Sequence, residues 1–154
     1  MKRTGRKQRE SNFVTVEFEA LPENQSFARS VVSAYAASSD PTAAELTEIK
    51  TAVSEAVSNS IIHGYGKTGT GKIVMEMKTI DRDKIYIKIT DFGKGIADIK
   101  KAREPLFSTE EEQEMSGMGF TVMESFTDKV FVESEQGKGT AVTLIKYLDT
   151  YHGI

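Results

Sequence analysis

Three short motifs in a fixed order constrain this chain more than any other feature. They are residues 54–64 (SEAVSNSIIHG), residues 91–95 (DFGKG) and residues 116–120 (SGMGF). A carboxylate and a carboxamide on one helix, followed by two glycine clusters, are the parts that a magnesium–nucleotide site needs. The Walker pattern G-x-x-x-x-G-K-[ST] is absent from the sequence, so a P-loop fold is not indicated.

The first motif belongs to a long predicted helix. Thr42 and Glu45 form a capping box at its start, apolar residues follow at helical spacing, and Gly64 ends it. Glu55, Asn59 and His63 recur every four residues, so they share one stripe beside the apolar face. An asparagine offers an oxygen to Mg²⁺, and a glutamate can accept a hydroxyl proton. His63 has two interpretations, a site residue or a C-terminal helix cap.

The rest of the chain alternates between strand and helix patterns. Strands are predicted at residues 13–20, 72–80, 84–90, 129–134 and 139–147, and the last two meet in a hairpin at residues 136–139. Further helices are predicted at residues 24–38 with Asn24 as N-cap, 96–102 and 117–126. The first of these helices would bury Phe27, Val31, Ala34 and Tyr35. Residues 104–116 lack an apolar period and are interpreted as a mobile lid.

These elements predict an α+β fold, a two-layer sandwich whose mixed, mostly antiparallel sheet is covered by helices on one face. With 154 residues, the chain predicts a single domain over residues 13–150. Residues 1–12 read as a disordered basic tail with a local charge of about +4, which leaves about −7 on the remainder. An acidic body argues against nucleic acid as a direct ligand, and no apolar run is long enough for a membrane span. The lack of cysteine fits a cytoplasmic location.

The two glycine clusters have their own chemical interpretations. Asp91 follows an alternating strand, and a carboxylate there can accept a hydrogen bond from an exocyclic amine such as that of adenine. On its own, D-x-G-x-G is more often a turn than a nucleotide site. The glycines of residues 116–120 open a helix, where free backbone N–H groups suit a triphosphate. An ordinary junction between loop and helix would look the same.

The order of the motifs resembles the Bergerat-type ATPase/kinase superfamily of gyrase, Hsp90, MutL and histidine kinases. Within it, the sequence from about residue 14 to 148 resembles the SpoIIAB-like family of sporulation anti-sigma factors. Residues 24–29 (NQSFAR), 45–51 (ELTEIKT) and 104–107 (EPLF) carry this narrower resemblance, because they lie outside the nucleotide motifs. The resemblance implies the histidine-kinase-like ATPase fold.

The resemblance also implies site residues and cofactors. Glu55 would be the general base of a protein-serine kinase, Asn59 would hold Mg²⁺, and Arg29 would contact protein partners. Asp91 would read the adenine, with Thr140 supporting that contact. The residues implied to bind ATP or ADP and Mg²⁺ are Asn59, His63, Asp91, Gly93, Gly95, Ile96, Ser116, Gly117, Met118, Gly119, Phe120 and Thr140.

Members of the SpoIIAB-like family are homodimers that inhibit the sporulation sigma factor sigma-F and phosphorylate the anti-anti-sigma factor SpoIIAA. The resemblance implies the same partners for this chain. The chain departs from the family at Met115, where an arginine thought to approach the γ-phosphate is expected. Lys101 or Arg103 could substitute for that arginine. The alternatives are an RsbW-type stress-response anti-sigma kinase and an ATP-dependent sigma-binding module with impaired kinase activity. A histidine-kinase catalytic domain and a plain ATPase are less favoured.

Overall fold

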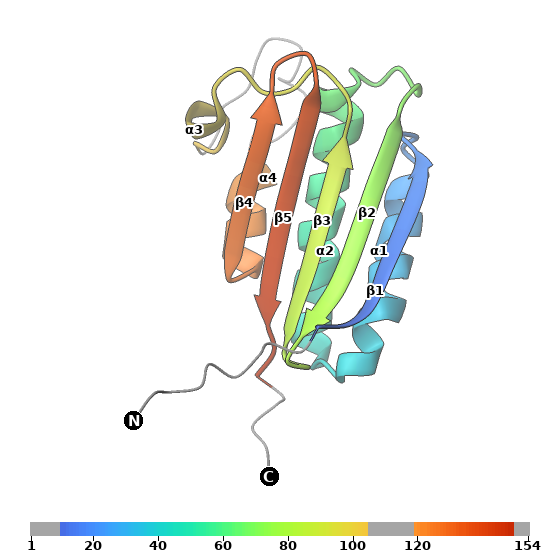
Figure 1. Ribbon diagram of the computed structural model, residues 1–154, viewed down its shortest axis with the longest axis vertical. Helices are drawn as coiled ribbons and strands as arrows, with labels where there is room; N and C mark the ends of the chain where they lie inside the picture. The colour runs from blue at the N-terminus through green and yellow to red at the C-terminus, as the bar shows by residue number, and fades with distance from the viewer. Residues whose placement is uncertain (1–9, 105–118, 150–154) are drawn as a thin grey trace.

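A five-stranded antiparallel sheet forms one layer of the molecule, and helices cover one of its faces (Figure 1). The computed structural model describes residues 10–104 and 119–149. The sheet order is β1-β2-β3-β5-β4, and each neighbouring pair is antiparallel. The strands are β1 (Glu10–Glu19), β2 (Lys72–Ile80), β3 (Lys84–Asp91), β4 (Lys129–Glu135) and β5 (Gly139–Tyr147). The predicted α+β sandwich is confirmed, and its sheet is antiparallel throughout these strands.

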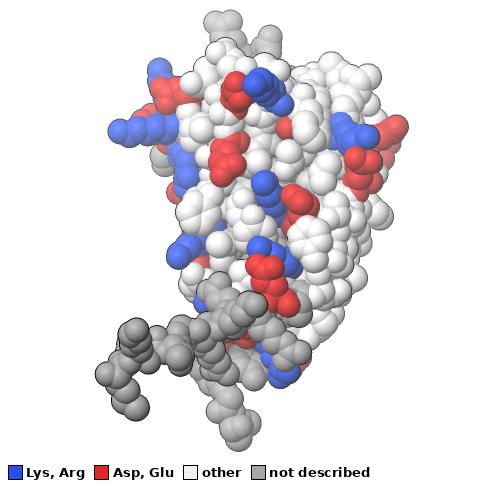
Figure 2. Space-filling model, in the orientation of Figure 1, with Lys and Arg blue, Asp and Glu red and all other residues white. Residues whose placement is uncertain are grey.

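Strict alternation in the two middle strands creates the core. In β2 and β3 every second side chain is buried, and these inward side chains are almost all Ile or Met. Such a period of two puts alternate side chains on opposite faces, so one face of the sheet packs and the other remains open. Figure 2 shows the open face, where acidic and basic side chains are interspersed. The motif at residues 91–95 begins at the last residue of β3, so it lies at one end of the sheet.

The helices are α1 (Asn24–Ala36), α2 (Ala43–Asn59), α3 (Ile99–Ala102) and α4 (Gly119–Phe126), with a short 3₁₀ turn at Ala37–Ser39. Thr42 caps α2, and its capping box with Glu45 is complete, as the sequence predicts. After Asn59 the helix widens into a π-helical turn, Ser60–Gly64, in which the N–H of Tyr65 donates to the carbonyl of Ser60. Turns of this kind often occur at functional sites.

Several predicted boundaries and one cap are wrong. Glu23, not Asn24, is the N-cap of α1; Asn24 is already helical, and its amide donates to the carbonyl of Glu19. The side chains that α1 buries are Ala28, Val32, Tyr35 and Ala36, while Phe27 is 46% exposed and Ala34 is exposed. Strand β1 begins at Glu10, so the end of the predicted basic tail belongs to the sheet. Most of that tail and of the predicted lid lies outside the described residues.

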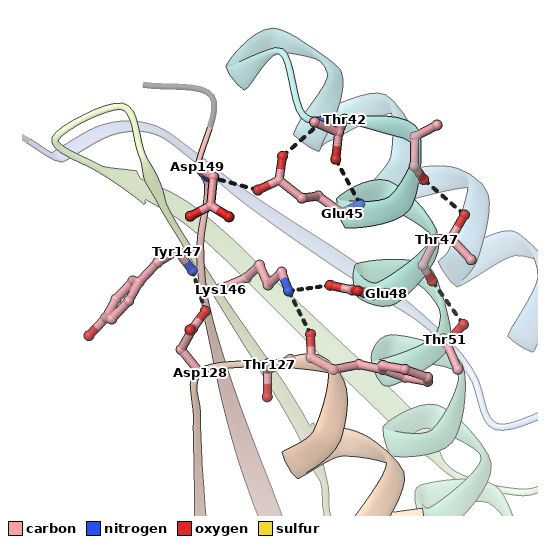
Figure 3. Close-up of polar contacts among 12 residues, drawn as sticks. Thr42, Glu45, Thr47, Glu48, Thr51, Thr127, Asp128, Lys146, Tyr147 and Asp149 are labelled. Atoms are coloured by element: carbon pink, nitrogen blue, oxygen red, sulfur yellow. Dashed lines mark hydrogen bonds and ion pairs between the residues drawn. The ribbon is translucent and has the colours of Figure 1, made fainter. Parts of the chain in front are cut away.

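A polar network at the end of α2 farthest from its π-helical turn ties this helix to β5 and α4 (Figure 3). The ammonium of Lys146 donates to Glu48 on α2 and to the carbonyl of Phe126, which ends α4. The second carboxylate oxygen of Glu45 accepts the N–H of Asp149 at 2.8 Å. These contacts fix one end of α2 against the sheet, so its other end is presented in a defined position. No helix in residues 10–104 or 119–149 combines the length and apolar character needed to cross a membrane.

Candidate active site

A pocket of about 760 Å³ lies where the C-terminal half of α2 meets the end of β3, the loop into α3 and the start of α4. The pocket brings together nine of the residues that the sequence singles out. These are Glu55, Asn59, His63, Asp91, Gly95, Ile96, Gly119, Phe120 and Thr140. Gly93 stands just outside its lining, and Ser116, Gly117, Met118 and Met115 lie outside the described residues. Segments far apart in the sequence therefore converge on one cavity.

The wall formed by α2 carries the predicted stripe. Glu55, Asn59 and His63 all line the pocket, which is what a four-residue spacing on one helix face produces. Burial raises the pKa of the Glu55 carboxyl above its ordinary value. A raised pKa makes this carboxylate a better proton acceptor at neutral pH.

Asp91, the last residue of β3, lines the pocket beside the π-helical turn and is only 4% exposed. Burial raises the pKa of its carboxyl, and hydrogen bonds from the Gly93 backbone, the Ser60 side chain and the Thr140 backbone oppose that rise. The Gly93 N–H donates to Oδ1 at 3.0 Å. The carboxylate is therefore held in one orientation while it faces the cavity. An acceptor fixed in this way suits an N–H donor on a ligand.

The glycines around Asp91 have a packing reason that the sequence did not reveal. A Cβ on Gly93 would lie 2.0 Å from the carbonyl oxygen of Gly64, and one on Gly95 would lie 2.2 Å from that of Glu135. Gly95 also has a φ of +75°, a conformation that favours glycine. Gly64 packs against the Asp91 carboxylate, where a Cβ would come within 2.9 Å. The close approach that these glycines permit is thus to neighbouring protein atoms.

Tyr65 connects two of the segments next to Asp91, and sequence reasoning did not identify it. Its hydroxyl accepts the N–H of Phe92 at 2.7 Å and donates to the carbonyl of Lys72. One side chain thereby joins the start of β2 to the residue after Asp91. Because these contacts span 7 and 27 residues of sequence, no local pattern indicates them.

Charged side chains on the loop side also line the pocket; the sequence offers Lys101 as a substitute for the family arginine but gives no site role to Lys94 or Asp98. Lys94, Asp98 and Lys101 all line the cavity. Asp98 caps α3, because its carboxylate accepts the N–H of Lys101 at 3.1 Å. An Asp directly before a short helical segment is an N-cap signal that could have placed this segment.

Arg29 lies on α1 and is not among the residues that line the pocket. Its guanidinium donates to the hydroxyl of Ser54 at 2.9 Å, and the amide of Gln25 donates to the same hydroxyl. Ser54 immediately precedes Glu55 on α2. The predicted partner residue is therefore anchored beside the helix that carries the predicted base.

Comparisons with known proteins agree with this architecture. Residues 18–146 match the family model described as a histidine kinase-like ATPase domain. Two proteins named Anti-sigma F factor, from Geobacillus sp. (strain WCH70) and Bacillus subtilis (strain 168), are 52% and 50% identical to the chain over 137 residues. Each alignment covers 89% of this chain and 93% of the relative.

Among solved structures, the RsbU and RsbW domains of a Mycobacterium tuberculosis protein superpose with a TM-score of 0.66 at 17% identity. That match covers 90% of this chain and 33% of the solved chain. A blue-light activated histidine kinase of Erythrobacter litoralis gives a TM-score of 0.55 at 18% identity, covering 75% of this chain and 34% of its own. Both likenesses concern the fold alone. The identities near 50% over almost the full length go further: the chain belongs to the anti-sigma F factor family, built on the histidine kinase-like ATPase domain.

Proposed function

We propose that the protein binds and inhibits the sporulation sigma factor sigma-F and, as an ATP-dependent serine kinase, phosphorylates the anti-anti-sigma factor SpoIIAA. One observation carries the proposal. In a chain about half identical to proteins named Anti-sigma F factor, Glu55, Asn59 and Asp91 line a single pocket. The fold alone would not identify the reaction, because one fold serves many chemistries.

The residues of the pocket fit an adenine nucleotide. The oriented carboxylate of Asp91 can accept an N–H from the base, and Ile96, Phe120 and Val142 give the cavity apolar walls. The side-chain oxygen of Asn59 lies where a Cβ on Gly119 would be 3.0 Å away, so glycine leaves room beside it. Asn59 would hold Mg²⁺, which when bound neutralises charge on the phosphates.

Glu55 performs the proton transfer in this proposal. Its carboxylate accepts the proton of the partner serine hydroxyl as that oxygen bonds to the γ-phosphorus of ATP and the bond to the β,γ-bridging oxygen breaks. The products are phosphoserine on the partner, ADP and a protonated Glu55, which then returns its proton to solvent. The raised pKa of Glu55 supports this role, because it strengthens the carboxylate as a base.

Arg29 is the residue proposed to contact the protein partners. It is partly exposed and held by Ser54, so its guanidinium is anchored on the outer side of the α1 and α2 pair. We also propose a homodimer located in the cytoplasm. Light scattering on the purified protein measures the first of these, and a monomer at micromolar concentration would contradict it.

Intact mass spectrometry tests the reaction directly. The protein is mixed with Mg-ATP and SpoIIAA, and a shift of one phosphate on SpoIIAA, mapped to a serine, is the expected result. Glu55→Gln should retain ATP binding and lose the shift; full transfer by that variant would contradict the base assignment. Arg29→Glu should lose both partners while remaining folded, and unchanged binding would contradict its proposed role.

Met115 favours a second candidate function, an ATP-dependent sigma-binding module whose phosphoryl transfer is impaired. A lost cationic contact to a transferring phosphoryl group lowers the rate by orders of magnitude. Sigma-F binding with bound ATP but no phosphoserine would support this candidate, as would transfer that rises on Met115→Arg. An RsbW-type stress-response regulator is the remaining alternative, and the sigma factor that co-purifies with the protein distinguishes it.

A further inference from the structure

The charges around the pocket are unevenly distributed for a site that holds a triphosphate. Its lining contains three carboxylates, those of Glu55, Asp91 and Asp98, and two ammonium groups, those of Lys94 and Lys101. A triphosphate bound among carboxylates requires compensating cations close to its terminal phosphates. The chain has Met115 where the resembled family has an arginine. Mg²⁺ held by Asn59 would supply part of this charge, and among the described lining residues Lys94 and Lys101 are the side chains with a full positive charge that could supply more.

Arg103 is already engaged elsewhere. Its Nε and Nη2 both donate to one carboxylate oxygen of Glu124 on α4, at 2.9 and 2.5 Å. Arg103 is not among the lining residues. Its ion pair instead ties the end of α3 to α4, the helix that starts at Gly119 beside Asn59. The segment containing Lys101 is thus held on the side of the pocket where Asn59 and α4 meet.

Lys94 belongs to the other side of the pocket. Its backbone N–H donates to the carbonyl of Gly64 at 3.0 Å, and its carbonyl accepts the N–H of Gly137 at 2.7 Å. Both contacts fix Lys94 in the loop that follows Asp91, near the proposed adenine contact. Lys94 therefore lies beside the proposed adenine contact, on a different segment of the pocket from Lys101.

Lys101 meets the remaining requirements. It lines the pocket, it is exposed, and its backbone is fixed by the Asp98 cap at the start of α3. Within residues 10–104 and 119–149, no carboxylate lies within ion-pair distance of its ammonium. Among the described residues, no carboxylate competes with a ligand for this charge.

We propose that Lys101 binds the terminal phosphates of a nucleoside triphosphate in this pocket and supplies the positive charge that position 115 lacks. The inference rests on the proposed function for the identity of its ligand. It adds that Lys101 raises the affinity for a nucleoside triphosphate more than that for a diphosphate and does not affect the affinity for adenosine. A lysine suits this role as a flexible point charge. Charge-assisted contacts of this kind correspond to about a ten- to hundredfold change in affinity.

Calorimetric titration of the full chain with Mg-ATP, Mg-ADP and adenosine tests the proposal. Lys101→Met should weaken ATP about ten- to hundredfold, weaken ADP less and leave adenosine unchanged. Lys101→Arg should restore most of the ATP affinity. Lys100→Met is the matched control, because the neighbouring lysine is on the same helix, is equally exposed and does not line the pocket. Equal ATP affinity in the Lys101→Met and Lys100→Met variants would overturn the proposal.

The design separates this inference from the proposed function. If the natural sequence transfers phosphate to SpoIIAA but Lys101→Met behaves like the control, the kinase assignment stands and Lys101 is rejected. If ATP binds and depends on Lys101 but no phosphoserine forms, the Lys101 site stands and the kinase assignment fails. In the transfer assay, Lys101→Met should lower kcat as well as ATP affinity, whereas Lys100→Met should change neither.

Discussion

Replacing Gly93 by alanine tests how tightly the corner of the pocket is packed. An ideal Cβ on Gly93 would lie 2.0 Å from the carbonyl oxygen of Gly64 and 2.4 Å from its carbonyl carbon. Both neighbours are backbone atoms, so no flexible side chain can move aside. Separation to ordinary contact, at least 3.4 Å, would pull the loop after β3 away from the end of the π-helical turn. The hydrogen bond from the Lys94 N–H to the Gly64 carbonyl, now 3.0 Å, would be lost with it.

The expected loss in the free energy of unfolding follows from these contacts. Overpacking costs about 1–3 kcal/mol, and the lost hydrogen bond adds about 1 kcal/mol. Alanine also restricts the unfolded chain, which offsets about 0.4–1 kcal/mol. The net expectation for Gly93→Ala is about 1–3.5 kcal/mol, or a fall in Tm of about 2–14 °C for a domain of this size.

Thermal unfolding followed by circular dichroism measures this effect, with Gly66→Ala as the control. Gly66 has a φ of +64° and nothing within 4 Å of its Cβ position, so alanine there adds backbone strain without a clash. The control should lose about 1 kcal/mol or less, because strain and unfolded-state restriction nearly cancel. A Gly93→Ala variant no less stable than Gly66→Ala would refute the argument that backbone contact requires this glycine.

Three further predictions concern single side chains. Lys146→Met should lower the free energy of unfolding by about 1–2 kcal/mol in urea denaturation, because the Lys146 side chain is 12% exposed and that of its partner Glu48 is 37% exposed. ATP affinity should not change, because neither residue lines the pocket; a large change would contradict this. Tyr65→Phe should cost about 0.5–1.5 kcal/mol in the same assay, since the exposed Phe92 N–H and Lys72 carbonyl exchange the phenol hydroxyl for water. The pKa of the Glu55 carboxyl is higher in the folded than in the unfolded state. Between these two pKa values the folded state keeps a proton that the unfolded state has lost, so the free energy of unfolding falls as pH rises above 4.5. Glu55→Gln should therefore be more stable than the natural sequence at pH 7 and equal to it below about pH 4.5, and a loss of stability at pH 7 would contradict this.

Local patterns predicted the elements whose determinants lie close together in the sequence. The capping box of α2 needs only Thr42 and Glu45, and the alternation of β2 and β3 is visible in each strand alone. The hairpin between β4 and β5 follows from the glycines of residues 136–139, and Gly137 indeed has a φ of +84°. The stripe on α2 likewise follows from the period of a helix.

The predictions that were wrong concern side chains whose burial depends on contacts between segments far apart in the sequence. Two faces of α1 have helical spacing, and contact with α2 selects the one with the small residues Ala28 and Ala36 over the one with Phe27. Phe27 instead makes an edge contact with Phe18, at 5.9 Å between ring centroids. Tyr65 was missed as a site residue for the same reason, because its place depends on which distant segments meet. Sequence thus indicated the chemistry of the site better than the side chains that position it.

The π-helical turn at Ser60–Gly64 fixes the number of residues between Asn59 and the corner of the pocket. Its hydrogen bond from the Tyr65 N–H to the Ser60 carbonyl spans five residues, one more than in a regular α-helix. In this geometry the Gly64 carbonyl accepts the Lys94 N–H at 3.0 Å. Deleting any one residue there would restore a regular helix and rotate everything beyond it by about 100°. Gly64 would then swing away from Gly93. We therefore expect that inserting or deleting a residue in this turn would disrupt the corner that holds Asp91 more than a substitution at an outward position would.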